Sequence, residues 1–237
     1  MATWITHTRI ADDLLNDCPK IDPRGFYVGN IAPDCNTENA DWTSFTPPRE
    51  ITHWMTGKSK LTAEYERFFQ AHVQNRQICS EEERAFLWGY YAHLITDVAF
   101  QSFVREERRV KSLFDRIKAV PSLYQKIETL PETFDTLKLV FGNRRIYKDI
   151  AFLETEYLQN HPKSGYLTVL REVKAFPDYL EYFPAGAFPR KIAVMANIPD
   201  EPEPAEGLVF FSREEYETFI QTTKMIICRK IREKVDA

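Results

Sequence analysis

Apolar residues recur at helical spacing along most of the chain, and this pattern predicts an all-α protein. The longest apolar run, Trp88–Phe100, is hydrophobic on nearly every side, which is typical of a buried helix. Ser80, with Glu83 three residues later, has the spacing of a helix N-cap and predicts where that helix begins. We expect it to extend to about Val104. Further helices are predicted over about 3–15, 61–77, 110–119, 131–140, 145–160, 165–175 and 211–234.

Between these segments the sequence predicts loops and short connections. Residues 26–32 form a short apolar segment that stops at Pro33, and 35–48 read as a long polar loop. The charged residues 105–109 are predicted to be solvated, and the aromatic tract 179–189 is loop-like. No repeat, low-complexity tract or domain boundary is evident. The simplest prediction is one helical domain that spans residues 1–237.

Composition supports helices and limits the classes of function. Only 8 of the 237 residues are glycine, which is low for a turn-rich β protein. The net charge of −4 argues against broad binding of a nucleic-acid backbone, although it leaves room for a local site. Four cysteines without a CxxC pair predict neither a zinc ribbon nor a disulfide framework. With no signal-peptide pattern and no apolar run of transmembrane length, we expect a cytoplasmic protein.

Two ionisable residues interrupt the buried helix. His93 and Asp97 are four positions apart, so they share one helical face. Gly89 lies one turn earlier on that face, where the missing side chain leaves room. A buried carboxylate is unfavourable by several kcal/mol unless it is paired, and a metal ion is one such partner. The alternative is a structural hydrogen bond between histidine and aspartate within the core.

Three more residues carry similar chemistry. His7 lies on the first predicted helix, Asp34 follows the turn at Pro33, and His53 follows the polar loop. Three imidazoles and two carboxylates match the preferences of zinc, manganese or iron. An Asx turn at Asp34, a loop histidine at His53 and a packed histidine at His7 are the structural alternatives.

The order of these motifs resembles a known family. Thr6-His7, Gly29-Asn30-Ile31-Ala32-Pro33-Asp34, Thr52-His53-Trp54 and Gly89-Tyr90-Tyr91-Ala92-His93-Leu94-Ile95-Thr96-Asp97 together resemble the zinc-dependent phospholipase C family, in particular its bacterial cytosolic members. That family shares its all-helical fold with the single-strand-specific nucleases. The resemblance therefore implies a multi-helix bundle of the phospholipase C and nuclease type.

The resemblance also implies a site and a reaction. Asp34, His53, His93 and Asp97 would hold one zinc ion, and Asp97 would bridge to a second ion that His7 helps to bind. Asp34 would also act in catalysis as a general base. The implied reaction is hydrolysis of a phosphodiester by a metal-activated water. The implied substrate is a phospholipid head group or another small phosphoester.

The sequence departs from the family's pattern at two places. Secreted relatives use an N-terminal tryptophan as a metal ligand, whereas Trp4 is internal here. No histidine lies between His93 and His161, so a third metal site would have to use carboxylates. Asp149, Glu154 and Glu156 are the candidate donors. We therefore expect a centre with one or two metal ions.

Two other functions remain open from the sequence. A phosphohydrolase of the HD type is also helical and uses histidine and aspartate ligands, but this chain has no His-Asp dipeptide. A non-catalytic protein could use the metal only to brace its helices while it binds a partner. Four protein ligands would suit that role, because they complete the coordination of a structural zinc.

Overall fold

The protein is all-α, as the apolar pattern predicts. The computed structural model describes residues 2–17, 20–41 and 43–235. Within those residues the strands are β1 (Thr37–Glu38) and β2 (Phe45–Thr46), a short antiparallel pair inside the predicted polar loop. The regular structure elsewhere in the described residues is helical. In chain order the helices are α1 (Trp4–Asp17), α2 (Pro23–Ile31), η1 (Ala32–Asp34), α3 (Arg49–Thr52), η2 (Lys60–Thr62), α4 (Tyr65–Phe69), η3 (Gln70–Gln74), α5 (Glu81–Val104), α6 (Glu107–Lys118), α7 (Pro121–Tyr124), α8 (Phe134–Ile146), α9 (Lys148–Asn160), α10 (Gly165–Thr168), η4 (Leu170–Glu172), α11 (Ala187–Met195) and α12 (Arg213–Val235).

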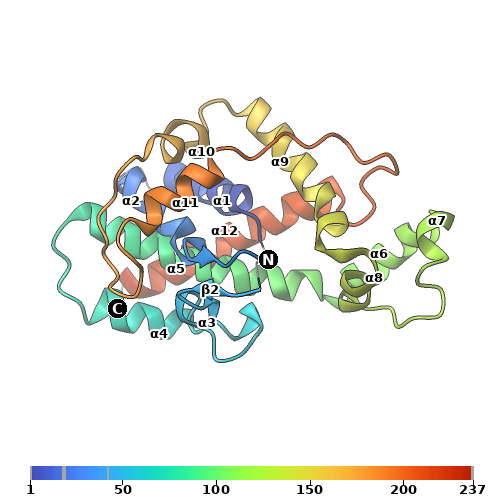
Figure 1. Ribbon diagram of the computed structural model, residues 1–237, viewed down its shortest axis with the longest axis horizontal. Coiled ribbons are helices and arrows are strands. Elements are labelled where there is room, and N and C mark those ends of the chain that lie inside the picture. Colours follow the sequence, from blue (N-terminus) through green and yellow to red (C-terminus); the bar gives the residue numbers. More distant parts are fainter. Residues whose placement is uncertain (1, 18–19, 42, 236–237) are drawn as a thin grey trace.

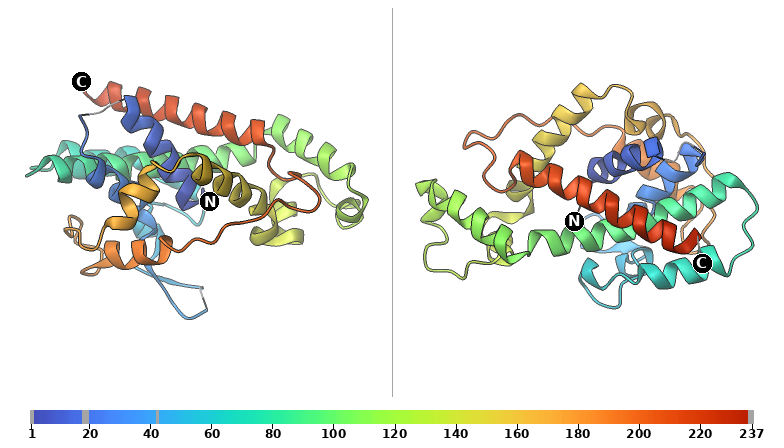
Figure 2. Two further views of the ribbon diagram at one scale, coloured as in Figure 1. Left: turned by 90° about the horizontal axis from the view of Figure 1, so that it is seen from above. Right: turned by 180° about the vertical axis from the view of Figure 1, so that it is seen from behind.

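Helix α5 is the central element of the fold. The Ser80 side chain accepts a hydrogen bond from the Glu83 backbone N–H, which is the predicted cap. Helix α2 packs along α5, and α1 packs against both α2 and α12. Helix α12 runs beside α5 in both views of Figure 2, so α5 is covered on several sides. Figure 1 shows α6, α7 and α8 gathered at one end of the molecule.

Two glycines allow α2 and α5 to approach at backbone distance. A Cβ atom on Gly89 would lie 2.2 Å from the carbonyl oxygen of Phe26, and one on Gly29 would lie 1.9 Å from that of Phe86. The room beside Gly89 is therefore filled by the backbone of α2. This contact also places the Asn30 carbonyl oxygen 2.8 Å from Nδ1 of His93.

Replacing Gly29 with alanine is expected to destabilise the protein strongly. The new methyl group would meet rigid backbone, so the helices must separate, at a cost of about 3 kcal/mol. For a chain of this size we expect the melting temperature to fall by about 10 °C. Thermal unfolding followed by circular dichroism measures this. Gly57→Ala is the matched control, because its Cβ would lie 3.6 Å from the Thr62 side chain, an ordinary contact. Equal melting temperatures for the two variants would contradict the close helix contact.

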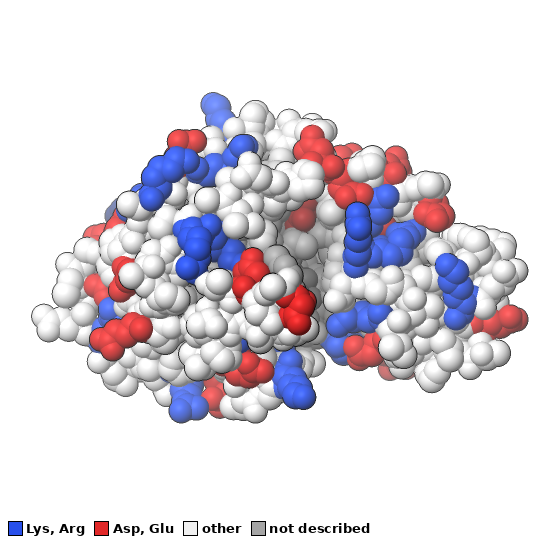
Figure 3. All heavy atoms as spheres, in the orientation of Figure 1, with Lys and Arg blue, Asp and Glu red and all other residues white. Residues whose placement is uncertain are grey.

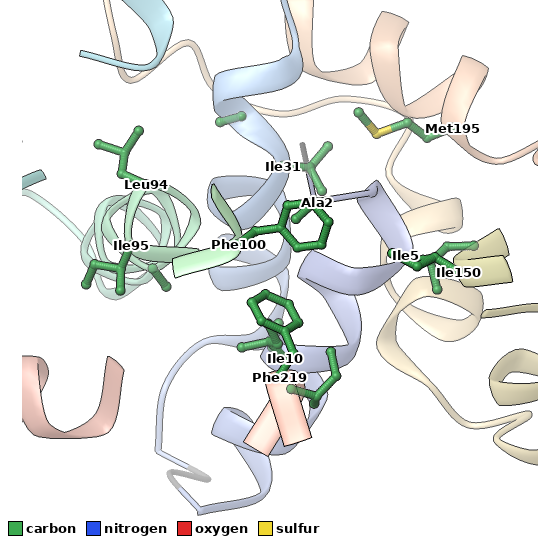
Figure 4. Close-up of a cluster of buried hydrophobic side chains, with 14 of the residues drawn as sticks. Ala2, Ile5, Ile10, Ile31, Leu94, Ile95, Phe100, Ile150, Met195 and Phe219 are labelled. Atoms are coloured by element: carbon green, nitrogen blue, oxygen red, sulfur yellow. The ribbon is translucent and has the colours of Figure 1, made fainter. Parts of the chain in front are cut away.

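The core joins helices that are distant in sequence. Figure 4 shows side chains from α1, α2, α5, α9, α11 and α12 that meet in one cluster. Phe100 of α5 and Phe219 of α12 lie edge to face, with ring centroids 5.3 Å apart. No described helix combines the length and the apolar character that a bilayer crossing requires.

Several segments differ from the sequence-based expectation. Residues 26–31 belong to α2 and Ala32 to η1. Helix α2 begins at Pro23 because proline suits the first position of a helix and the Asp22 side chain caps it. The predicted helix over 61–77 is divided into η2, α4 and the π-helix η3. Helix α11 begins inside the aromatic tract 179–189, which the sequence predicts to be loop-like, and it continues beyond that tract. Arg109, in the charge cluster predicted to be solvated, is 5% exposed and donates a hydrogen bond to the Phe210 carbonyl oxygen.

Candidate metal centre

The structure brings all five predicted ligands into one buried cluster. His7 comes from α1, Asp34 from η1, His53 from the C-cap of α3, and His93 and Asp97 from α5. The three histidines and Asp97 are fully buried, and Asp34 is 6% exposed. Two overlapping groups, His7 with His93 and Asp97, and Asp34 with His53 and His93, each have ligand atoms within 4.8 Å of one another.

Local structure explains how Asp34 and His53 reach α5. Pro33 has no N–H to continue the hydrogen bonding of α2, and it lies in the single turn η1, which ends at Asp34. His53 follows one turn of helix α3, and its Nδ1 lies 3.2 Å from the Arg49 carbonyl oxygen. The Tyr90 hydroxyl donates to the Thr52 carbonyl oxygen and ties this turn to α5.

Three pairs of ligand atoms among four of these residues have the spacing of atoms bound to one metal ion. The Asp34 Oδ1 to His53 Nε2 distance is 3.1 Å, His53 Nε2 to Asp97 Oδ2 is 3.6 Å, and His93 Nε2 to Asp97 Oδ2 is 3.1 Å. Nitrogen and oxygen ligands at zinc-bonding distance in a tetrahedron lie about 3.3 Å apart. We call Asp34, His53, His93 and Asp97 the quartet.

Unpartnered polar atoms support a cation at this place. The Asn30 carbonyl oxygen can only accept, so Nδ1 of His93 carries the hydrogen and its Nε2 presents a lone pair to Asp97. Among the described residues, Nε2 of His93 and Oδ1 of Asp97 have no hydrogen-bond partner. Buried acceptors without a hydrogen-bond partner are unfavourable unless a positive charge lies nearby. The carbonyl behind His93 is also the usual partner of a metal-bound histidine.

His7 lies beside the quartet. Its ring stacks on His93 with centroids 3.8 Å apart and an interplanar angle of 4°. Its Nε2 is 3.8 Å from Oδ1 of Asp97, the oxygen that faces away from the quartet. Neither ring nitrogen has a hydrogen-bond partner among the described residues. This arrangement agrees with the position in which His7 would help to hold a second ion.

Lys60 is a further member of the cluster, and the sequence pattern gives no sign of it. Its Nζ donates a hydrogen bond of 2.5 Å to Oδ2 of Asp97 and lies 3.5 Å from Oδ1 of Asp34. Lys60 is 8% exposed, although it follows a Gly-Lys-Ser segment that reads as a surface break. A lysine in such a segment is normally solvated, so only the three-dimensional contact identifies it.

The charges in the cluster shift its pKa values in a consistent way. Burial raises the pKa of Asp34 and of Asp97, but the Lys60 ammonium and the neighbouring imidazoles outweigh burial and hold both values well below the ordinary range. Burial, followed by the Lys60 ammonium, lowers the pKa of His53 to about 4. Burial and His93 lower the pKa of His7. Ionised carboxylates and neutral imidazoles are the protonation states that bind a metal.

A cavity of about 660 Å³ adjoins the cluster. Trp4 and Lys60 line it and also contact the cluster, because the indole Nε1 of Trp4 donates a 3.1 Å hydrogen bond to Oδ2 of Asp34. Trp4 therefore interacts with the cluster through its side chain. Figure 3 shows that this face of the molecule is hollowed near its centre, close to the start of the chain marked in Figure 1.

The three carboxylates considered for a third metal site have other partners. Asp149 accepts hydrogen bonds from the backbone N–H groups of Phe210 and Phe211. Glu156 pairs with Arg213. Glu154 accepts hydrogen bonds from the hydroxyl groups of Thr3, Thr6 and Tyr216.

Glu154 gives the protein a predictable pH dependence. Burial raises the pKa of Glu154 to about 7, although the surrounding hydroxyl groups oppose the shift. An exposed glutamate titrates near 4.3. Between these values the unfolded chain releases its proton first, so the free energy of unfolding falls as pH rises from about 4 to about 7. The free energy of unfolding of Glu154→Gln minus that of wild type is expected to increase by about 2–3 kcal/mol from pH 4.5 to pH 8.

Urea unfolding at several pH values measures this difference. Glu156→Gln is the control, since Glu156 lies two residues away on α9 and is only partly buried. The control should follow the wild-type pH profile. If the free energy of unfolding of Glu154→Gln and that of wild type changed in parallel with pH, Glu154 would not have a raised pKa.

Comparisons with known proteins bear on the same segment. Residues 5–100 match the family model of zinc-dependent phospholipase C. No curated protein and no solved structure matches the chain. The matched segment contains all five predicted ligands and Lys60. The match confirms, over residues 5–100, the predicted resemblance to the zinc-dependent phospholipase C family.

Proposed function

We propose that the protein is a metal-dependent phosphoesterase that hydrolyses a phosphodiester. The observation that carries the proposal is the quartet, in which three pairs of ligand atoms lie 3.1–3.6 Å apart beside a cavity of about 660 Å³. The family match supports a hydrolase of this kind. Zinc is the proposed metal, with manganese or iron as alternatives for the same donor set.

The quartet would hold one ion, and His7 with Asp97 is the proposed place for a second. A divalent metal held there would supply Lewis-acid activation of water and of a phosphoryl oxygen. Asp34 is the proposed general base. Among the five proposed ligands it is the most exposed, and its low pKa keeps it ionised as a hydrogen-bond acceptor.

Lys60 and Trp4 connect this chemistry to the cavity. The Lys60 ammonium lies at the boundary between the two carboxylates and the cavity, where it can bind a phosphoryl oxygen. The Trp4 indole fixes one oxygen of Asp34 and leaves the other toward His53. The chain thus provides a fixed base and a fixed cation for an anionic substrate.

A second candidate is a metal-braced binding protein without catalysis. The complete burial of His53, His93 and Asp97 favours it, since four protein ligands can close a structural zinc site. In that case the cavity would bind a partner or ligand without cleavage.

Metal removal and reconstitution distinguish the candidates. Purified protein is analysed for metal content, treated with a chelator, and assayed with bis-p-nitrophenyl phosphate before and after addition of zinc or manganese. Hydrolysis that is lost with the metal and restored by it supports the phosphoesterase. Bound metal with no hydrolysis under any reconstitution supports the binding protein. Absence of any transition metal overturns both candidates.

A further inference from the structure

We infer that the cavity beside the cluster recognises an organic phosphate that carries a second anionic group besides the phosphate that is cleaved. This inference rests on the proposed function and specifies its substrate class. It follows from the side chains that line the cavity, which form a local region of positive charge on an acidic protein.

The lining is rich in cations. Arg49, Lys58, Lys60, Arg105 and Lys138 line the cavity, and Glu154 is its acidic residue. These cations come from four separate segments: α3, the connection before and into η2, the C-cap of α5, and α8. The chain as a whole has a net charge of −4, so the excess of cations around the cavity is opposite in sign to the net charge of the protein. Figure 3 shows Lys and Arg side chains to the right of the central hollow.

Existing ion pairs account for only part of this charge. Lys60 is held by Asp97, and Arg105 forms a 2.7 Å ion pair with Asp135. Among the described residues, Lys58 and Lys138 have no acidic partner. Arg49 lies over the Phe45 ring at 3.8 Å, which fixes its guanidinium without neutralising it. Three cations therefore remain to balance the charge of a ligand.

The acidic residue in the lining does not cancel this charge. Glu154 is 4% exposed and its carboxylate is already bonded to three hydroxyl groups. The Glu154 carboxylate is therefore expected to repel an anionic ligand only weakly. Lys60 faces the cluster, whereas Lys58 and Lys138 lie on the η2 and α8 sides of the cavity. If the phosphate that is cleaved binds near Lys60, the remaining cations of the cavity can bind a second anionic group of the same ligand.

The size and apolar part of the cavity limit the ligand further. The volume of about 660 Å³ suits a molecule larger than inorganic phosphate, and Ile5, Met55 and Tyr147 supply less polar surface. A phosphodiester with an additional phosphate or carboxylate fits these features. Such a group occurs both on acidic lipid head groups and on soluble organic phosphates, so the experiment must separate these sources.

Binding to the metal-free protein tests the inference without requiring catalysis. Calorimetric titrations compare glycerophosphoinositol 4-phosphate, which has an extra phosphate, with glycerophosphocholine, which has a cation instead. We expect the first to bind at least about tenfold more tightly. Lys138→Gln should weaken its binding about tenfold. The control Lys163→Gln removes an exposed lysine that does not line the cavity and should leave binding unchanged.

The outcomes separate this inference from the proposed function. Equal affinity for the two diesters, or no effect of Lys138→Gln, overturns the inference even if metal-dependent hydrolysis is found. Selective binding without hydrolysis supports the inference while the phosphoesterase proposal fails. Vesicles that contain phosphatidylinositol 4-phosphate provide the last comparison. Tighter binding to them than to the soluble diester identifies a lipid ligand, and binding to the soluble diester alone identifies a soluble one.

Discussion

Replacing Asp97 with asparagine is expected to abolish stoichiometric metal binding and to reduce phosphodiester hydrolysis by about a thousandfold. Asp97 is the hub of the cluster, since Oδ2 lies 3.1 Å from His93, 3.6 Å from His53 and 2.5 Å from Lys60. Oδ1 faces His7 at 3.8 Å. Asparagine keeps the shape but removes the negative charge, which leaves Lys60 buried with only Asp34 to balance it.

Metal content by elemental analysis and hydrolysis of bis-p-nitrophenyl phosphate measure the effect. Asp115→Asn is the matched control, because Asp115 is exposed on α6. If Asp97→Asn does not fold, His53→Gln keeps both carboxylates and should also lose the metal. A full complement of metal in both ligand variants would show that the quartet is not the metal site.

The sequence predicted the helices whose own apolar pattern and caps are strong. Helix α5 begins at the predicted cap and ends at Val104, because an apolar run with a serine cap has few alternative structures. Helix α2 was missed for the opposite reason. Its proline and two glycines left only a short apolar segment to predict, yet Pro23 starts the helix and Gly29 serves the contact with α5. A close contact between two helices depends on both of them, so the sequence of one segment alone does not reveal it.

In the candidate site, too, some residues were predicted from the sequence and others are identified only by contacts in the folded protein. Spacing placed His93 and Asp97 on one face, residue chemistry added His7, Asp34 and His53 as candidates, and the family resemblance implied the role of each. The structure brings all five together, although metal binding itself stays a prediction. Lys60 could not be predicted, because its segment has no periodicity and because a lysine is seldom buried. The indole contact of Trp4 with Asp34 likewise depends on how α1 and η1 meet.

Replacing Lys60 with methionine is expected to destabilise the metal-free protein and to slow hydrolysis about a hundredfold. Lys60 is the ammonium group between Asp34 and Asp97, so its loss leaves two buried carboxylates without their cation. Breaking a buried ion pair costs about 3–5 kcal/mol, and the melting temperature should fall by about 10 °C. Zinc brings positive charge to the same carboxylates, so it should raise the melting temperature more in the variant than in wild type.

Thermal unfolding with and without zinc, together with the zinc stoichiometry and kcat/KM, tests this role. Lys163→Met is the control, because Lys163 is exposed and distant in sequence from the cluster. The expected result is a variant that still binds zinc but hydrolyses slowly, which separates the role of Lys60 from that of a metal ligand. An unchanged melting temperature of the metal-free variant would show that Lys60 does not balance the carboxylates. An unchanged kcat/KM with zinc bound would show that its charge acts only in stability, because a cation that binds the phosphoryl oxygen must affect the rate.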